Sequence, residues 1–245
     1  MQWLLLLTQY FTRIPVNREL DYSPENFRIA SYFYTLHTAF IGLIPMALSL
    51  GMKLIGVPVI FNALITLTLI LFLTGALHLD GFADTVDGLF SGRSRERILE
   101  IMKDPTMGSY GTVAIVLNLA FKTFILFELI VRNQVYLIPL IMASGKIGVA
   151  LAGHIGKQAK VDSSANLVIG NIPAPSVLVN TGLTLILAFV LGEILSYSLA
   201  LVTLYLMTLL VTWCCHKKLN GLVGDNMGFI AELGEIIVGV FLVSL

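Results

Sequence analysis

Charged residues are scarce in this sequence: 12% of its 245 residues are Asp, Glu, Lys or Arg, whereas an ordinary soluble domain has about a quarter. The 15 basic and 15 acidic side chains cancel, so no excess of positive charge favours a nucleic-acid partner. The two cysteines, Cys214 and Cys215, are adjacent in an apolar run, which excludes a disulfide framework. The whole sequence is 57% hydrophobic and has a mean hydropathy of +0.89, which predicts an integral membrane protein in a lipid bilayer.

Apolar runs of membrane length recur along the chain. A transmembrane helix needs about 20 predominantly apolar residues, and such runs lie at roughly 31–52, 58–79, 111–131, 135–153, 177–195, 196–215 and 228–245. We therefore expect an all-α polytopic membrane protein with six or seven transmembrane helices. No repeat, linker or low-complexity tract divides residues 1–245, which predicts a single membrane-embedded catalytic domain. The opening MQWLLLLTQYF is too short to cross and lacks signal-peptide features, so we expect an interfacial or re-entrant helix.

Basic loop residues gather on one side of these expected spans. Of the 15 Lys and Arg residues, two lie inside spans (Lys122 and Lys146) and two on one side (Lys53 and Arg132), which leaves eleven on the other. Because basic loops are retained in the cytoplasm, the side with more basic residues is expected to be cytoplasmic. It holds every long polar connection, which predicts a polar active site facing the cytoplasm: 12–30, 80–110, 154–176 and 216–227.

Three aspartates follow the second apolar run, in the segment DGFADTVDG at residues 80–88. The spacing i, i+4, i+7 places Asp80, Asp84 and Asp87 on one face of an α-helix. Like charges this close at the edge of a bilayer need a compensating cation, and Mg²⁺ is typically shared between one or two carboxylates and substrate phosphates. The flanking Gly81 and Gly88 would let a phosphate ester approach the backbone. The spacing thus predicts a magnesium site, with a solvated helix end as the alternative.

The next residues, SGRSRERILEIMKDPTMGSYG, predict a short amphipathic helix. Ser94 is a candidate N-cap and Pro105 a candidate end, so that Glu100 and Asp104 would stand at i, i+4. Basic side chains there and in the first polar segment are candidates for phosphate contacts, although retention of basic loops in the cytoplasm also accounts for them: Arg13, Arg95, Arg97 and Lys103.

A second polar insertion, LNGLVGDNMGFIAELGEII, opens the last apolar run. Asp225 and Asn226 lie in a glycine-rich turn, and Glu232 and Glu235 enter the run at i, i+3. Acidic residues within a span indicate a functional site by default, with favourable acids at a helix N-terminus as the alternative. His78 stands two residues before the first aspartate of the stripe. The sequence contains no GxSxG or Walker pattern.

These segments together resemble the cobalamin synthase family, the adenosylcobinamide-GDP ribazoletransferases. HLDGFADTVDGLFSGRSRERILEIMKDPTMGSYG at 78–111 resembles the central signature, and three shorter segments resemble the family's other polar motifs: FTRIPV at 11–16, LVIGNI at 167–172 and GLVGDNMGFIAELGE at 221–235. Two sites depart from the family's pattern. Pro105 and Thr106 replace a usual Ser-Arg or similar pair, and Lys146 replaces a common arginine, whose bidentate contacts lysine cannot reproduce.

The resemblance implies a Mg²⁺-dependent transferase of the cell (inner) membrane that joins α-ribazole, or its 5′-phosphate, to adenosylcobinamide-GDP and releases GMP. In that reaction the aspartates of the 80–88 stripe would hold the metal, and Asp104 or Asp225 would accept the hydroxyl proton or add a ligand. The remaining candidates would contact substrate: Arg13, His78, Arg95, Arg97, Lys103, Asn226 and Glu232. Homo-oligomerisation and association with other cobalamin-assembly enzymes both stay open.

Two rival functions predict different patterns. CDP-alcohol phosphatidyltransferases also place metal-binding aspartates at a span end, but their DGxxAR pattern is absent from this sequence, which reads DGFAD. An ion-coupled transporter would need openings on both faces and polar residues near the middle of its spans. Near mid-span we find only Lys122, Glu128 and Lys146, and Lys122 would need a partner on another helix.

Overall fold

The computed structural model describes residues 2–159 and 164–245, and within them the chain is helical apart from its connections. The predicted all-α architecture is confirmed. Short 3₁₀ turns stand at Ser31–Phe33, Val135–Leu137 and Ser164–Leu167. The α-helices are α1 Gln2–Phe11, α2 Pro24–Ala30, α3 Tyr34–Leu54, α4 Val59–Thr74, α5 Leu77–Phe90, α6 Arg95–Ile101, α7 Ser109–Val131, α8 Ile138–Ile155, α9 Ala174–Val190, α10 Ile194–Leu219 and α11 Gly224–Ser244.

Five helical segments in the described part of the chain are long and apolar enough to cross a membrane: Pro24–Leu54, Ser109–Val131, Val135–Ile155, Ile194–Leu219 and Gly224–Ser244. A sixth crossing requires α4 and α5 together, and these two helices are bent by 89°. The apolar α9 has only 17 residues. The count therefore falls at or below the lower end of the six or seven expected, because two of the predicted runs are interrupted or short.

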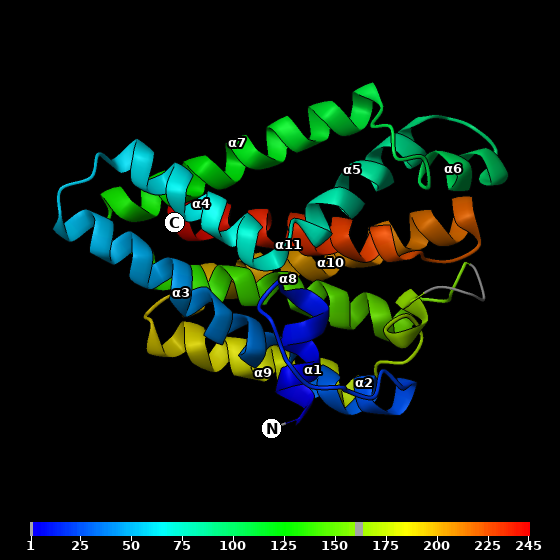
Figure 1. Cartoon of the computed structure of the whole chain (residues 1–245), viewed down its shortest axis with the longest axis horizontal. Helices are drawn as coiled ribbons and strands as arrows, with labels where there is room; N and C mark the ends of the chain where they lie inside the picture. Colours follow the sequence, from blue (N-terminus) through cyan, green and yellow to red (C-terminus); the bar gives the residue numbers. More distant parts are fainter. Residues whose placement is uncertain (1, 160–163) are drawn as a thin grey trace.

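A belt of exposed apolar side chains marks where lipid contacts the protein. On α7 it runs from Val113 to Val131, and on α10 from Leu195 to Trp213. Each stretch rises about 27 Å at 1.5 Å per residue, close to the roughly 30 Å of a bilayer's hydrocarbon core. Figure 1 shows α6, the start of α7 and the α10–α11 connection together at one end of the molecule, beyond this belt. The long polar connections thus meet at one end, although residues 160–163, including Lys160, lie outside the described residues.

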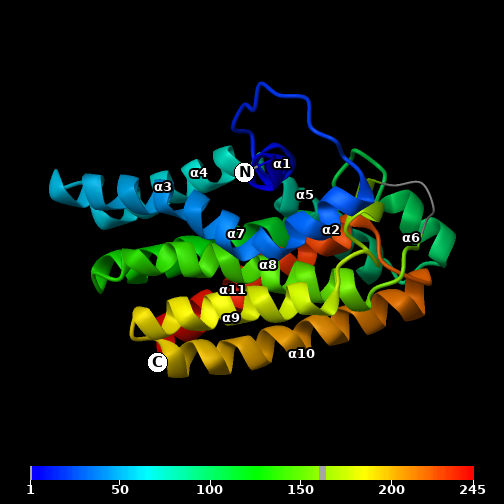
Figure 2. The same ribbon diagram turned by 90° about the horizontal axis from the view of Figure 1, so that it is seen from below.

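The centre of the bundle is α8, which is buried along almost its whole length. Figure 2 shows it between α3 on one side and α9 and α11 on the other. Small residues allow these close approaches, as in other membrane bundles. A Cβ on Gly145 would lie 2.7 Å from the carbonyl oxygen of Ala231, and a Cβ on Gly42 would lie 2.7 Å from Cα of Pro139. The helix backbones therefore pack directly against one another.

The second apolar run breaks immediately before the aspartates. Gly75 and Ala76 both adopt left-handed backbone conformations, with φ of 62° and 53°, which ends α4 and sets α5 at its new angle. Arg13 packs at this break: its backbone N–H donates to the carbonyl of Leu73 at 2.7 Å, and its side chain occupies the space where a Cβ of Gly75 would stand. The expectation of one continuous span over 58–79 was wrong, because a left-handed turn ends the helix at Thr74.

Candidate active site

The three aspartates of the stripe share α5, as their spacing predicted, but their environments differ. Asp80 is exposed, Asp84 is half-buried, and the Asp87 side chain is buried. Burial disfavours the ionised form of Asp84, and so do the charges of Asp225, Asp80 and Asp87, in decreasing order. The carboxylate of Asp225, from the first turn of α11, therefore joins those of α5 around one space.

Close contact between α5 and α11 brings Asp225 to this position. A Cβ on Gly81 would lie 2.7 Å from Cα of Asp225, and a Cβ on Gly228 would lie 2.8 Å from the carbonyl oxygen of His78. The rings of Phe82 and Phe229 stack with centroids 5.1 Å apart. Gly81 is thus covered by the backbone of α11, and the expectation that it leaves room for a phosphate ester was wrong.

Asp87 is held differently from the other two aspartates. Its Oδ2 accepts a hydrogen bond from the backbone N–H of Gly108, and its Oδ1 accepts one from Gly111, each at 2.8 Å. Gly108 is the residue that caps α7, so the carboxylate binds the positive end of that helix. Asp87 thereby fixes α7 against α5, and its role as a metal ligand stays a prediction.

Asn226 holds the start of α11 against α5. It is buried, its Oδ1 accepts the backbone N–H of Val223 at 2.9 Å, and its Nδ2 donates to Oγ1 of Thr85 at 3.1 Å. The side chain thus caps α11 and ties it to α5 at Thr85, the residue that follows Asp84. A direct contact of Asn226 with substrate stays a prediction.

The predicted helix after the stripe is shorter than expected. It ends at Ile101, so Asp104 and Glu100 do not share a helix, and that expectation was wrong. Asp104 instead accepts hydrogen bonds from the hydroxyl of Thr106 and from its backbone N–H, the latter at 2.8 Å, and these hold the pKa of Asp104 below its ordinary value. A local turn of this kind competes with helix for the same backbone groups. Ser94 stands at the N-cap position, but its side chain makes no capping hydrogen bond.

The basic candidates of this region already have partners or lie in solvent. Nε of Arg95 donates to the carbonyl of Leu219 at 2.8 Å, and its guanidinium also donates to the carbonyl of Ala159 at 3.1 Å, which ties α6 to the α10 end. Arg97 pairs with Glu100 on α6 at 2.8 Å. Lys103 is exposed. Phosphate contacts by these three residues stay predictions.

A second group of charges lies deeper, between α7 and α11. Nζ of Lys122 lies 2.7 Å from Oε2 of Glu232 and 2.6 Å from Oε2 of Glu235. Lys122 therefore has the partner on another helix that its position required, while Glu128 pairs with Arg132. Glu232 is a buried ion-pair partner in this arrangement, and its contact with metal or substrate stays a prediction.

His78 and Lys146 form a third polar contact. Nζ of Lys146 lies 2.8 Å from Nε2 of His78 and 3.6 Å from the ring centroid of Phe11. Lys146, which stands where the family commonly has an arginine, is thus part of the contact between α1, α5 and α8. Sequence reasoning did not place Lys146 in the site, although a lysine within an apolar run is the signal that could have found it.

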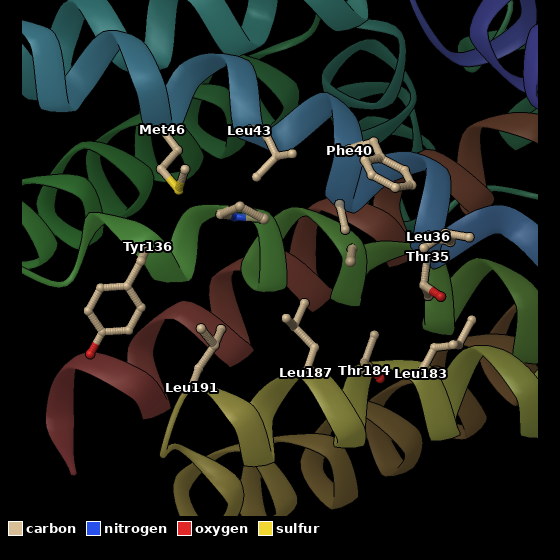
Figure 3. Close-up of a pocket in the computed structure, with 13 residues that line it drawn as sticks. Thr35, Leu36, Phe40, Leu43, Met46, Tyr136, Leu183, Thr184, Leu187 and Leu191 are labelled. Carbon is tan, nitrogen blue, oxygen red and sulfur yellow. The ribbon is translucent and has the colours of Figure 1, made fainter.

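One cavity adjoins the carboxylates directly. It has a volume of about 180 Å³ and is lined from α1, α5, α8, the 164–168 segment and α11, with Asp80, Asp225 and His78 among its polar residues. A second cavity, of about 380 Å³, lies between α3, α8 and α9. Figure 3 shows leucines of α3 and α9 facing each other across it. Among the described residues no Asp, Glu, His, Lys or Arg lines that second cavity, so those side chains offer nothing there for phosphate chemistry.

The model of the cobalamin-5-phosphate synthase family matches residues 3–243. This chain belongs to that family. The curated relatives carry the name adenosylcobinamide-GDP ribazoletransferase. The protein from Clostridium botulinum (strain Langeland) is 38% identical over 95% of this chain and 93% of its own length. The proteins from Treponema denticola and Klebsiella pneumoniae are 34% and 33% identical, over 97% and 93% of this chain and 96% and 94% of their own lengths. No solved structure matches the chain.

The carboxylates at this site suit a metal ion that is shared with substrate better than one that is bound by protein ligands alone. Within residues 2–159 and 164–245, no three His, Cys, Asp or Glu side chains are placed to hold a metal ion by themselves. Asp80 and Asp84 form no ion pair with a basic side chain in the same described ranges. Oxygen ligands from one or two carboxylates, completed by substrate phosphates and water, are the set that Mg²⁺ prefers. The residues present therefore fit magnesium bound together with a phosphorylated substrate.

Proposed function

We propose that this chain joins α-ribazole, or its 5′-phosphate, to adenosylcobinamide-GDP and releases GMP, a late step of cobalamin assembly. Membership of the family supports the reaction, and the gathering of Asp80, Asp84 and Asp225 where α5 meets α11 is the observation that supports the site. In the reaction a hydroxyl oxygen of ribazole bonds to the phosphorus that carries cobinamide. The bond from that phosphorus to the bridging oxygen breaks, and GMP leaves with this oxygen.

Asp80 and Asp84 are the residues that would hold Mg²⁺ against the pyrophosphate. The ion would neutralise charge on the phosphate oxygens and on the departing GMP. The choice of these two over Asp87 follows from their surroundings, because both oxygens of Asp87 already accept backbone hydrogen bonds. Asp87 then acts through α7, whose first turn it holds beside the site.

Asp225 is the better of the two candidate bases. A general base must reach the hydroxyl that it deprotonates, and Asp225 lies against Gly81 at the edge of the cavity. Asp104 is exposed beyond the end of α6, and its hydrogen bonds with Thr106 favour its ionised form, which makes it a weaker proton acceptor. We therefore assign the hydroxyl proton of ribazole to the Asp225 carboxylate.

The site is proposed to face the cytoplasm from the cell (inner) membrane. Two features support this orientation. The connections of one side hold an excess of basic residues. The helix α5 runs from the middle of the bundle toward the end where α6 and the α10–α11 connection lie (Figure 1). Both water-soluble nucleotides would then reach the carboxylates without crossing lipid, and the corrin ring would lie partly over the membrane surface.

A GMP-release assay tests this proposal. Purified protein in detergent is given adenosylcobinamide-GDP and α-ribazole 5′-phosphate, with Mg²⁺ or with a chelator. We expect GMP and the cobalamin product in equal amounts, loss of both with the chelator, and recovery when Mg²⁺ is returned. A folded protein that releases no GMP would contradict the proposed reaction, and equal rates with and without Mg²⁺ would contradict the role of the metal.

A further inference from the structure

The cavity beside the carboxylates is polar on one side and apolar on the other. The acidic side chains of Asp80 and Asp225 lie at its polar side. The rest of its lining is mainly aromatic or aliphatic and comes from α1, α8, the 164–168 segment and α11: Tyr10, Phe11, Val149, Ala165, Val168 and Met227. A ligand that fills this space must therefore carry an apolar group beside a group that reacts next to carboxylates.

The aromatic part of the wall is held in place by its own contacts. The edge of the Phe11 ring packs against Tyr34, with centroids 5.4 Å apart, and the Lys146 ammonium lies over the Phe11 ring. Tyr10 packs edge-on against Phe27 at 4.8 Å. Because these rings are fixed before a ligand arrives, they offer a preformed surface for a planar aromatic group.

The cavity volume limits what this surface can bind. A protein cavity of about 150 Å³ holds a benzene ring, so about 180 Å³ accommodates a small planar ring system. A corrin macrocycle is far larger and must lie elsewhere. Three ring systems of suitable size remain among the proposed substrates: the guanine and the adenine of adenosylcobinamide-GDP, and the dimethylbenzimidazole of α-ribazole.

The chemistry of the apolar wall separates the two purines from the benzimidazole. Guanine and adenine both have hydrogen-bond donors and acceptors along one edge, and burying them against valine, methionine and phenylalanine would leave them without partners at a large cost. Dimethylbenzimidazole has two methyl groups on the corresponding edge and loses nothing there. The apolar wall of Val149, Val168 and Met227 is suited to the methylated base.

We propose that this cavity binds the benzimidazole base of α-ribazole and so selects the nucleophile of the reaction. This inference rests on the proposed function above. With the base between Phe11 and Met227, the sugar lies at the polar side of the cavity. Its hydroxyl then stands beside Asp225, the residue assigned as base, and beside Asp80. Specificity for the base and alignment of the hydroxyl thus come from one pocket.

Gly224→Leu is the variant that tests the pocket. Gly224 lines the cavity at the first residue of α11. Among the described residues, the only atom within 4 Å of an added Cβ is Cβ of Ala165, at 3.5 Å, so the backbone accepts a side chain that narrows the cavity. Gly182→Leu on α9 is the matched control, because no atom of residues 2–159 or 164–245 lies within 4 Å of its added Cβ. We expect KM for α-ribazole 5′-phosphate to rise about tenfold or more in Gly224→Leu, with KM for adenosylcobinamide-GDP within about twofold, and neither value to change in Gly182→Leu.

A second variant works in the opposite direction. Val168→Ala enlarges the cavity and should increase kcat/KM for nucleosides with a bulkier base relative to α-ribazole. A rise in KM for adenosylcobinamide-GDP alone in Gly224→Leu would assign the cavity to the guanine or cobinamide and overturn the proposal. So would unchanged selectivity in both variants.

Calorimetry with α-ribazole and no second substrate separates this inference from the proposed reaction. Binding to wild type that is weakened in Gly224→Leu, in a protein that releases no GMP, would keep the pocket and reject the reaction. GMP release by a wild-type protein whose α-ribazole affinity does not respond to Gly224→Leu would keep the reaction and reject the pocket.

Discussion

Two groups of acidic residues in this molecule differ in how their charges are balanced. Glu232 and Glu235 lie deep in the bundle, and both ion-pair with Lys122 within 2.7 Å. Asp80 and Asp84 lie on α5, and the charged neighbours of Asp84 are the carboxylates of Asp225, Asp80 and Asp87. Within the described residues neither Asp80 nor Asp84 forms an ion pair. The deep group is compensated by the protein itself, whereas the group on α5 leaves room for a cation from solution.

This difference shows why acidic residues near a membrane need not share one role. An acid within a span or at its edge is a candidate functional residue on sequence alone. Glu232 and Glu235 stood within an expected span, and the aspartates of α5 directly followed one. Once partners are known, the paired acids of α11 are expected to stabilise the bundle, and the unpaired acids of α5 are expected to act on substrate. Changing each group separately tests whether the two groups have these different roles.

The largest expected effect is on activity, from Asp84→Asn. Loss of this carboxylate removes a proposed magnesium ligand while keeping the size of the side chain, so we expect turnover to fall by a factor of about 100 or more. The thermal unfolding midpoint should hold or rise, because the variant relieves repulsion from Asp225. Glu128→Gln, a carboxylate at the other end of α7, is the matched control and should retain wild-type turnover. Wild-type activity in Asp84→Asn would reject the metal site.

The second-largest effect is expected on the free energy of unfolding, in the variant Lys122→Met. The substitution removes the ion-pair partner of the buried Glu232 and Glu235, which we expect to cost about 3–5 kcal/mol. Unfolding in detergent, followed by circular dichroism, measures this loss. Changing both glutamates to glutamine in the same chain should recover part of the stability, since neither carboxylate is then left as a buried charge without Lys122. A Lys122→Met protein as stable as wild type would show that these charges are balanced in another way.

A smaller effect is expected from Gly81→Ala, which alters the distance between the two helices that carry the site. The added Cβ would stand 2.7 Å from the backbone of Asp225, so α5 and α11 must separate, at a cost of about 1–3 kcal/mol. Activity should fall with it, because Asp225 moves away from Asp84. Gly51→Ala on α3 is the control, since no atom in the described part of the chain lies within 4 Å of its added Cβ. Equal activity of the two variants would mean that the close approach is not needed for catalysis.

The smallest effect is expected from Asp104→Asn. Asp104 is exposed and bonded to Thr106 beyond the end of α6, so its loss should change kcat by less than about twofold if Asp225 is the general base. Initial rates of GMP release at saturating substrate measure this. A fall as large as that of Asp84→Asn would assign Asp104, rather than Asp225, to the chemistry.

The sequence predicted those features of the site that depend on local spacing. The placement of Asp80, Asp84 and Asp87 on one helix face followed from i, i+4, i+7, and the gathering of the polar connections at one end followed from the apolar runs. The end of α6 was missed although a signal existed, since Asp-Pro-Thr at 104–106 is a sequence typical of turns. The break in the second run was also missed although Gly75 is a typical residue at a helix C-terminus. The left-handed Ala76 that follows it has no such signal, because alanine rarely adopts that conformation.

Contacts between distant segments could not be predicted in the same way. Asp225 lies beside the aspartates of α5 because two glycines, Gly81 and Gly228, let α5 and α11 touch. Neither segment contains a pattern that predicts contact with the other. The partners of Lys122 likewise lie more than 100 positions away along the chain. The role of Asp87 as a cap required the position of α7. Such pairings depend on the tertiary packing of the bundle.

Magnesium binding in the presence of substrate tests the central claim most directly. Isothermal titration of Mg²⁺ into protein with adenosylcobinamide-GDP compares wild type, Asp84→Asn, and the triple variant Lys122→Met, Glu232→Gln, Glu235→Gln. The account predicts nucleotide-dependent Mg²⁺ binding in wild type and in the triple variant, and its loss in Asp84→Asn. Unchanged binding in Asp84→Asn, or loss confined to the triple variant, would contradict it and move the metal to the deep acids of α11.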